Sequence, residues 1–119
     1  MWIATKYGFY SAVSKGPKGS VCVRARVESD LENLRQFLPA MGEIIKNAGT
    51  DYPYRIYVNQ SAWAEVMAEM ATGIDYSNFK DEVAKTQGSA RAHVYGDVWW
   101  NLQELERLER AESATKGKA

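Results

Sequence analysis

The chain has one cysteine and one histidine among its 119 residues, and no excess charge of either sign. A single thiol cannot form an internal disulfide, which excludes a covalent framework of the secreted type. One cysteine and one histidine also cannot build the usual nitrogen and sulfur ligand sets of a zinc site. We therefore expect no metal and no cofactor. The lone thiol, Cys22, fits a reducing compartment.

A long apolar run is also missing. The first residues lack the basic segment and apolar segment of a secretion signal, and no stretch approaches the roughly 20 residues needed to cross a bilayer. Fifteen Lys and Arg residues balance fifteen Asp and Glu residues, so no overall field draws the chain to nucleic acid or to an anionic membrane. We expect a cytoplasmic protein that does not contact a membrane.

What the chain does have is a globular composition, 45% hydrophobic and 25% charged, with four Trp, seven Tyr and three Phe. This aromatic supply is enough for one core without covalent help. The length suits one domain, and no linker-like stretch separates two. We predict a single α+β domain over residues 1–110 and a flexible C-terminal tail at 111–119, which is small and polar.

Three segments have the composition of strands. Residues 2–14 are rich in aromatic and β-branched types, and residues 20–27 and 54–58 alternate between apolar and polar side chains. Two glycines and a proline at 15–19 are typical of a hairpin connection, so the first two strands should pair antiparallel. Gly8 inside the first strand indicates a bulge or a close backbone approach.

Helices are predicted between and after these strands. Ser29 and Glu32 form a capping box near Asp30, and Pro39 should kink or end that helix before a second piece reaching Asn47. Apolar spacing predicts further helices that end at Gly73, at Gln87 and near Arg110. The whole is a small three-stranded, mainly antiparallel sheet, the N-terminal hairpin plus one strand, packed with three to four helices in the order ββαβααα.

Several sequence strings together resemble a family of short, uncharacterised bacterial proteins, and the likeness reaches to about Trp99. The strings are Met1-Trp2, Gly8-Phe9-Tyr10-Ser11, Arg24-Ala25-Arg26, Thr50-Asp51-Tyr52-Pro53-Tyr54-Arg55 and Asp75-Tyr76-Ser77-Asn78-Phe79-Lys80. That family carries no assigned activity, substrate or site residue. The resemblance implies a bacterial or phage cytosolic origin and nothing about chemistry.

The polar face of the predicted sheet gathers basic and aromatic side chains from all three strands. They are Arg24, Arg26, Arg55 and Tyr57, with Tyr10 or Lys6 from the first strand. Guanidinium groups bind phosphate in a bidentate manner, and an aromatic ring stacks on a base, so this face is a candidate site for a nucleotide or single-stranded nucleic acid. The strands do not match the aromatic-rich consensus of known sheet-surface RNA-binding proteins. In the alternative interpretation, the arginines are solvated or pair with the acidic C-terminal helix.

The predicted last helix carries a second candidate contact. Its seam holds Val94, Val98, Leu102, Leu105 and Leu108 or Glu109. Trp99 and Trp100 are adjacent, so both rings cannot face inward on one helix, and one is a candidate for an exposed contact in a homodimer.

The sequence contains no catalytic motif, so we expect a small non-enzymatic binding or regulatory protein whose partner is another protein or a second copy of itself. One alternative is a small enzyme acting on a nucleotide or another phosphorylated substrate, with Tyr57, His93 or Asp75 moving the proton. Another is a phage-encoded inhibitor of a host or defence protein, which needs only a complementary surface.

Overall fold

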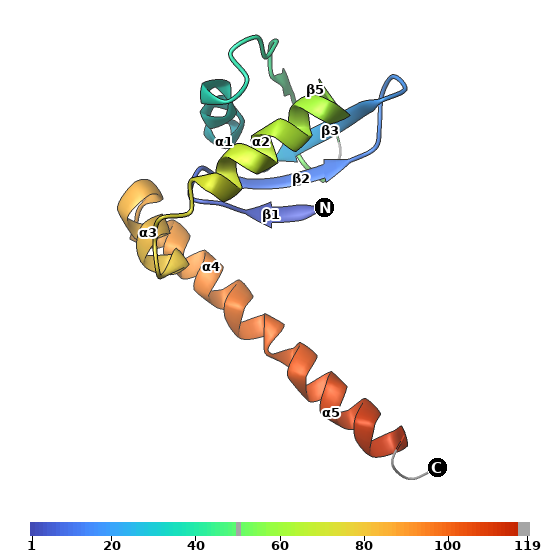
Figure 1. The fold of residues 1–119 in the computed structure, drawn as a ribbon, viewed down its shortest axis with the longest axis vertical. Helices are drawn as coiled ribbons and strands as arrows, with labels where there is room; N and C mark the ends of the chain where they lie inside the picture. Colours follow the sequence, from blue (N-terminus) through green and yellow to red (C-terminus); the bar gives the residue numbers. More distant parts are fainter. Residues whose placement is uncertain (50, 117–119) are drawn as a thin grey trace. The chain divides into compact units, whose positions relative to one another are not determined.

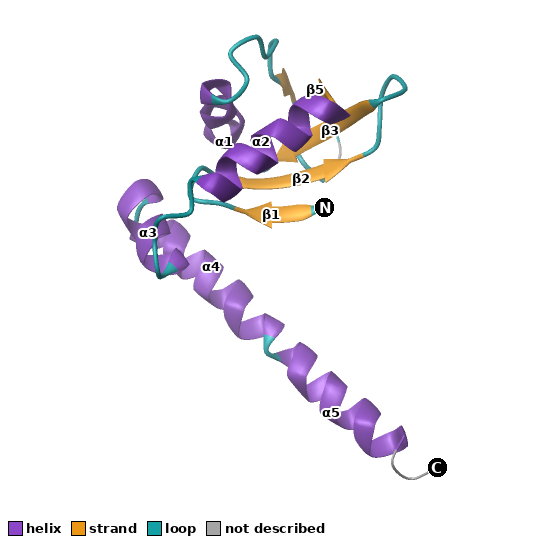
Figure 2. Ribbon diagram, in the orientation of Figure 1, coloured by secondary structure: helices purple, strands orange, loops and turns teal. Residues whose placement is uncertain are grey.

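The computed structural model describes residues 1–49 and 51–116 and confirms the α+β class with an antiparallel sheet (Figures 1 and 2). In chain order the elements are β1 (Trp2–Ala4), β2 (Phe9–Val13), β3 (Ser20–Ala25), α1 (Glu28–Glu32), the 3-10 helix η1 (Asn33–Gln36), β4 (Ile45–Lys46), β5 (Tyr54–Asn59), α2 (Gln60–Thr72), α3 (Phe79–Gln87), α4 (Ser89–Leu102) and α5 (Glu104–Lys116). No helix among the described residues combines the length and the apolar composition needed to span a bilayer.

The contacts divide the chain into two compact units, and we describe each by itself. Unit 1 is Met1–Tyr76 and unit 2 begins at Ser77. Unit 1 contains the whole sheet, whereas unit 2 is helical. Helix α5 continues to Lys116, into the segment for which the sequence predicts a flexible tail, and residues 117–119 of that segment lie outside the described residues.

The sheet has five strands in the order β1-β2-β3-β5-β4, so the predicted number of three is wrong. One extra strand arises because residues 2–14 form two strands and not one. The Thr5 backbone amide donates to the Gly8 carbonyl at 2.9 Å, while the Thr5 hydroxyl accepts from the amides of Tyr7 and Gly8 at 3.0 and 3.1 Å. This turn reverses the chain and pairs β1 antiparallel with β2.

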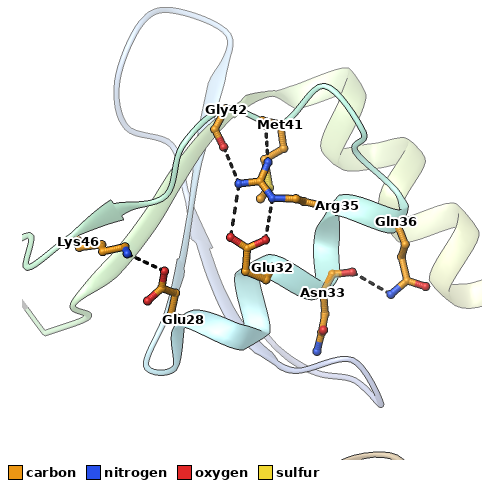
Figure 3. Close-up of polar contacts among 8 residues, drawn as sticks. All are labelled: Glu28, Glu32, Asn33, Arg35, Gln36, Met41, Gly42 and Lys46. Carbon is orange, nitrogen blue, oxygen red and sulfur yellow. Dashed lines mark hydrogen bonds and ion pairs between the residues drawn. The ribbon is translucent and has the colours of Figure 1, made fainter.

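The other extra strand, β4, lies where a second helical piece was predicted. The structure instead places a loop after η1, and the side chain of Arg35 holds that loop (Figure 3). Arg35 donates to the carbonyl oxygens of Met41 and Gly42 at 2.7 and 3.1 Å. With its carbonyl groups bound to Arg35, this segment does not continue as a helix, and Ile45 of β4 pairs with Arg55 of β5.

The same loop is tied to α1 by two ion pairs. Nε of Arg35 lies 2.7 Å from Glu32, and Nζ of Lys46 lies 3.0 Å from Glu28 (Figure 3). The hydrogen bonds from Arg35 hold the pKa of the Glu32 carboxyl below its usual value. The bond to Glu28 raises the pKa of Lys46.

The core of unit 1 lies between one face of the sheet and the helices α1, η1 and α2. The strands contribute Tyr10, Ala12, Val21, Val23, Ala25 and Ile56, and the other elements contribute Leu31, Leu34, Ile44, Trp63, Val66 and Met70. Tyr10 contacts Trp63 edge to face with centroids 6.3 Å apart, and its hydroxyl donates to the Asp30 carbonyl at 2.7 Å. Burial of this apolar area is the main source of stability in unit 1.

Unit 2 has little buried apolar surface of its own. Helix α3 packs on α4, with Phe79 stacked on Tyr95 at a centroid distance of 5.8 Å. Asn78 caps α3 by accepting from the Asp81 amide at 3.0 Å. Among residues 77–116, Val83 is the one apolar side chain that is fully buried.

Candidate functional site

The predicted arginines lie on the sheet face opposite the core. In an antiparallel sheet, residues directly across from each other point to the same side. Arg24 is paired with Ser11 on one neighbouring strand and with Arg55 on the other, while Cys22 is paired with Tyr57. Because Val23 and Ile56 are paired in the core, this second row of side chains points away from α1 and α2.

We call this surface the arginine face. Its members are Trp2, Phe9, Ser11, Cys22, Arg24, Arg55 and Tyr57, together with Arg26 just beyond β3. None of the residues in β1, β2, β3, β4 and β5 is acidic. The strands therefore contribute positively charged side chains to this face and no negatively charged ones.

Tyr52 holds two of these arginines in place. The guanidinium carbon of Arg24 lies 4.7 Å from the centre of the Tyr52 ring, and that of Arg26 lies 4.6 Å from it. Tyr52 is only 3% exposed, so its ring positions the two cations and is not itself available to a ligand. Arg26 also donates to the Asp51 carbonyl oxygen at 3.1 Å.

Arg24 is fixed a second time, by a hydrogen bond to Ser11. Its NH2 group donates to the buried Ser11 hydroxyl at 2.8 Å, while its Nε is buried with no hydrogen-bond partner among the described residues. Arg55, directly across from Arg24, is 9% exposed. Two arginine side chains are therefore directly paired across β3 and β5 on this face.

Exposed aromatic rings lie on the same face. Trp2 is 76% exposed and contacts Phe9 edge to face with centroids 6.3 Å apart. Tyr57 is 43% exposed. The turn between β2 and β3 approaches Tyr57 closely, because a Cβ on Gly16 would lie 2.7 Å from Cδ1 of that ring. The same turn carries two exposed lysines, Lys15 and Lys18.

The structure brings together four of the seven predicted site residues. Arg24, Arg26 and Arg55 share the arginine face with Tyr57, whereas Tyr10 is fully buried on the opposite face of the sheet. The other two, Trp99 and Trp100, belong to α4 of unit 2 and are both more than half exposed. Nζ of Lys80 lies 5.8 Å from the Trp99 ring.

The residues proposed for proton transfer come from both units of the chain. Tyr57 belongs to unit 1 and His93, an exposed residue of α4, to unit 2. Asp75 is exposed and lies 3.8 Å from Lys6. Cys22, whose side chain is on the arginine face, is completely buried. Within the part of the chain that the structure describes, no three side chains of His, Cys, Asp or Glu gather closely enough to hold a metal ion.

The sequence patterns do not identify several residues of this site, among them Trp2, Phe9, Tyr52 and Ser11, whose hydroxyl accepts from Arg24. The composition of residues 2–14 predicts one strand and so does not place Trp2 or Phe9 on a face, although the alternation of Phe9, Ser11 and Val13 puts Phe9 on the same side as Ser11. No alternation or helical spacing predicts the direction of the Tyr52 side chain. It lies between strands and reaches Arg24 and Arg26, which are more than 20 positions earlier, only through the fold.

Comparison with known proteins gives no name for this arrangement. No protein-family model matches the chain, and neither does any curated protein or any solved structure. The resemblance to short bacterial proteins remains an expectation from the sequence strings. Any function must therefore be argued from the residues of the two units.

Proposed function

We propose that this protein is a non-enzymatic binding protein whose arginine face holds single-stranded nucleic acid. One observation carries the proposal: exposed aromatic rings and guanidinium groups share a sheet face whose strands contain no acidic residue. The net charge of the chain is zero, so binding depends on this local surface and not on a global field.

The two kinds of side chain on the face match the two parts of a nucleotide. Unpaired bases stack on exposed aromatic rings, here Trp2 and Tyr57, and such stacking does not depend strongly on the base. Arginine pairs with phosphate in a bidentate manner, and Arg26 is the exposed arginine of the face. Stacking on Tyr52 and the bond to Ser11 hold Arg24 in one place, which reduces the entropy lost when a ligand binds.

The preference for single strands follows from the same geometry. In a duplex the bases are stacked on each other and cannot stack on Trp2 or Tyr57. A duplex would therefore meet only the cations of the face, and its binding should be weaker at moderate salt.

The test is a fluorescence anisotropy titration of labelled single-stranded DNA and RNA of about 16 nucleotides, a length that covers a typical single-strand site. The wild type should bind with an affinity that falls as salt rises. Trp2→Ala should weaken binding about 5-fold to 150-fold, since a base stacked on an aromatic ring contributes about 1–3 kcal/mol. Arg26→Gln should lower the salt slope by about 0.7, the loss of one phosphate contact.

Matched controls come from unit 2. Trp100→Ala removes a tryptophan that is 67% exposed, close to the exposure of Trp2, and Arg110→Gln removes an exposed arginine. Both controls should bind like the wild type. Absence of salt-dependent binding to any single strand, or equal losses in Trp2→Ala and Trp100→Ala, would show that the arginine face does not have this role.

A further inference from the structure

A small pocket is formed by β1, the turn that follows it and the C-terminal half of α2. Its volume is about 180 Å³, and every residue that lines it belongs to unit 1. Most of the lining is apolar and consists of Ile3, Ala4, Met67, Met70, Ala71 and Ile74. The pocket is therefore built within one compact unit and offers mainly apolar surface to a ligand.

The turn after β1 forms a fixed wall of this pocket. The Thr5 hydroxyl donates to the Gly8 carbonyl at 2.9 Å and accepts from the backbone amides of Tyr7 and Gly8. The Tyr7 ring contacts Phe37 edge to face, with centroids 5.0 Å apart. On α2, the thioether side chains of Met67 and Met70 can adapt to a ligand, and they pack well against aromatic rings.

The volume of the pocket suits one six-membered ring. An apolar cavity of about 150 Å³ holds one benzene molecule. Sites for larger organic ligands have volumes of about 300–1,000 Å³, so a nucleotide or a large cofactor would not fit here. We expect a ligand with a single ring and few substituents.

The pocket also carries a positive charge. Among its lining residues that the structure describes, Lys6 is the one with a charged side chain. Its Nζ lies 5.5 Å from the centre of the Tyr7 ring and 5.7 Å from that of Tyr76, two further lining residues. The Lys6 side chain is only 18% exposed, so its attraction for an anion is stronger than it would be in bulk water.

Lys6 already has a carboxylate partner, and that partner indicates the group that a ligand would supply. A carboxylate oxygen of Asp75 lies 3.8 Å from Nζ of Lys6, which is beyond hydrogen-bond distance. The Asp75 side chain is 80% exposed, and an exposed ion pair of this kind contributes little to stability. A ligand carboxylate can therefore take the place of Asp75 at little cost.

We propose that this pocket binds a small aromatic carboxylate, with its ring against Met67 and Met70 and its carboxylate at Lys6 in place of Asp75. Burial of the ring supplies most of the affinity, and the ion pair supplies the preference for an acid. None of the lining residues is a member of the arginine face. The proposal therefore does not depend on nucleic-acid binding.

The experiment is an NMR titration of the ¹⁵N-labelled full chain with benzoate, with benzamide as its uncharged isostere and with acetate as the acid without a ring. Benzoate should bind with a Kd of about 1 mM or tighter and shift the amide signals of lining residues such as Tyr7 and Ala71. Benzamide should bind about 5-fold more weakly, because it cannot form the ion pair. Acetate should not saturate these shifts.

Four variants locate the site. Ala71→Phe should abolish binding of benzoate and benzamide, because its ring occupies the pocket, whereas Ala68→Phe, at another exposed alanine of α2 outside the lining, should bind both like the wild type. Lys6→Met should lower the affinity for benzoate about 5-fold and leave that for benzamide unchanged. Asp75→Asn should raise the affinity for benzoate about 2-fold to 5-fold, because it removes the competing carboxylate.

Arg26→Gln is the control for the arginine face and should bind benzoate like the wild type. The proposal is wrong if benzoate shifts no lining residue, if benzamide binds as tightly as benzoate, or if Ala71→Phe binds benzoate normally. An unchanged or weakened affinity in Asp75→Asn would likewise contradict it. Should Lys6→Met fail to fold, as judged by its NMR spectrum, the comparison of benzoate with benzamide and the exposed Asp75→Asn variant still decide.

Discussion

The two units of this protein obtain their order in different ways. In unit 1, side chains distant in sequence meet in a core, as Tyr10 of β2 does with Trp63 of α2. In unit 2, the described contacts join helices that are neighbours in sequence, such as Phe79 and Tyr95. Unit 1 is therefore stabilised by hydrophobic burial, as an independent domain is. Within unit 2, the stabilisation comes mostly from helix propensity and from packing between neighbouring helices.

The exposed surfaces of the two units differ in the same way. The arginine face rests on strands whose other side is packed, so its side chains are held in place before a ligand arrives. Val98 and Leu105, on helices α4 and α5 of unit 2, are at least half exposed, while Tyr95 of α4 stacks on Phe79 of α3. We expect unit 1 to present a preformed site.

The largest expected effect compares a leucine from each unit. Leu31 is completely buried in unit 1, and Leu31→Ala should lower the free energy of unfolding by about 2–5 kcal/mol, because it removes packed methyl groups and leaves a cavity. Leu105 is mostly exposed in unit 2, and Leu105→Ala should change the unfolding of a monomer by about 0.5 kcal/mol or less. Urea denaturation of both variants gives the two values.

Protein concentration sharpens this test. Where the chain associates through Leu105, the cost of Leu105→Ala rises with protein concentration, because association stabilises the folded chain by mass action. The cost of Leu31→Ala should be nearly the same at every concentration. Equal costs for the two leucines at low concentration would contradict the proposed difference between the units.

Two glycines give changes of opposite sign. A Cβ on Gly8 would lie 2.6 Å from Cβ and Cγ of Asp30, so Gly8→Ala should destabilise unit 1 by about 1–3 kcal/mol. A Cβ on Gly96, inside α4, would meet only the end of the Lys80 side chain at 3.7 Å, an ordinary contact. Gly96→Ala should therefore stabilise α4 by about 0.5–1 kcal/mol, the helix propensity gained.

Denaturation followed by circular dichroism measures both changes, with Gly42→Ala as the control in unit 1, since no atom lies within 4 Å of a Cβ there. A neutral Gly8→Ala would mean that β2 and Asp30 can separate at no cost. A destabilising Gly96→Ala would mean that α4 is more tightly packed than the exposure of its side chains Val94 and Val98 suggests.

Much of the fold followed from local patterns in the sequence. Alternation located β3 and β5, and the glycines and proline at 15–19 located the turn between β2 and β3. Gly8, expected inside a strand at a bulge or a close backbone approach, lies in the turn between β1 and β2, where the Asp30 side chain approaches it. The errors occurred where a side chain distant in space decides the structure. The bonds of Arg35 to two carbonyl groups formed a loop where apolar spacing predicted a helix.

The candidate site was predictable only in part, for the same reason. The alternation of strand residues placed Arg24 and Arg55 on one face, and the structure pairs them directly. The sequence could not relate Tyr52 to these arginines, because a loop has no period that predicts where its side chains point. Nor could it align the first strand with the others, since the turn at Thr5 sets which side Tyr10 occupies.

The smallest expected effect compares two Glu–Arg pairs with the same spacing of three residues. In unit 1, Arg35 binds Glu32 together with the carbonyl groups of Met41 and Gly42. In unit 2, Arg107 pairs with Glu104 alone among the described residues. Glu32→Gln should therefore lower the urea midpoint more than Glu104→Gln does, although both changes are small because both pairs are exposed.

The pH dependence of this difference has a definite sign. Because pairing holds the pKa of Glu32 below its usual value in the folded state, the stabilisation is complete above the usual glutamate pKa. It is lost as the pH falls through the lowered folded-state value, where the carboxyl becomes protonated. Urea midpoints measured from neutral pH downward should show the wild type and Glu32→Gln converging in acid. A gap that stays constant across this range would mean that the loop after η1 is held by the carbonyl bonds of Arg35 and not by the charge of Glu32.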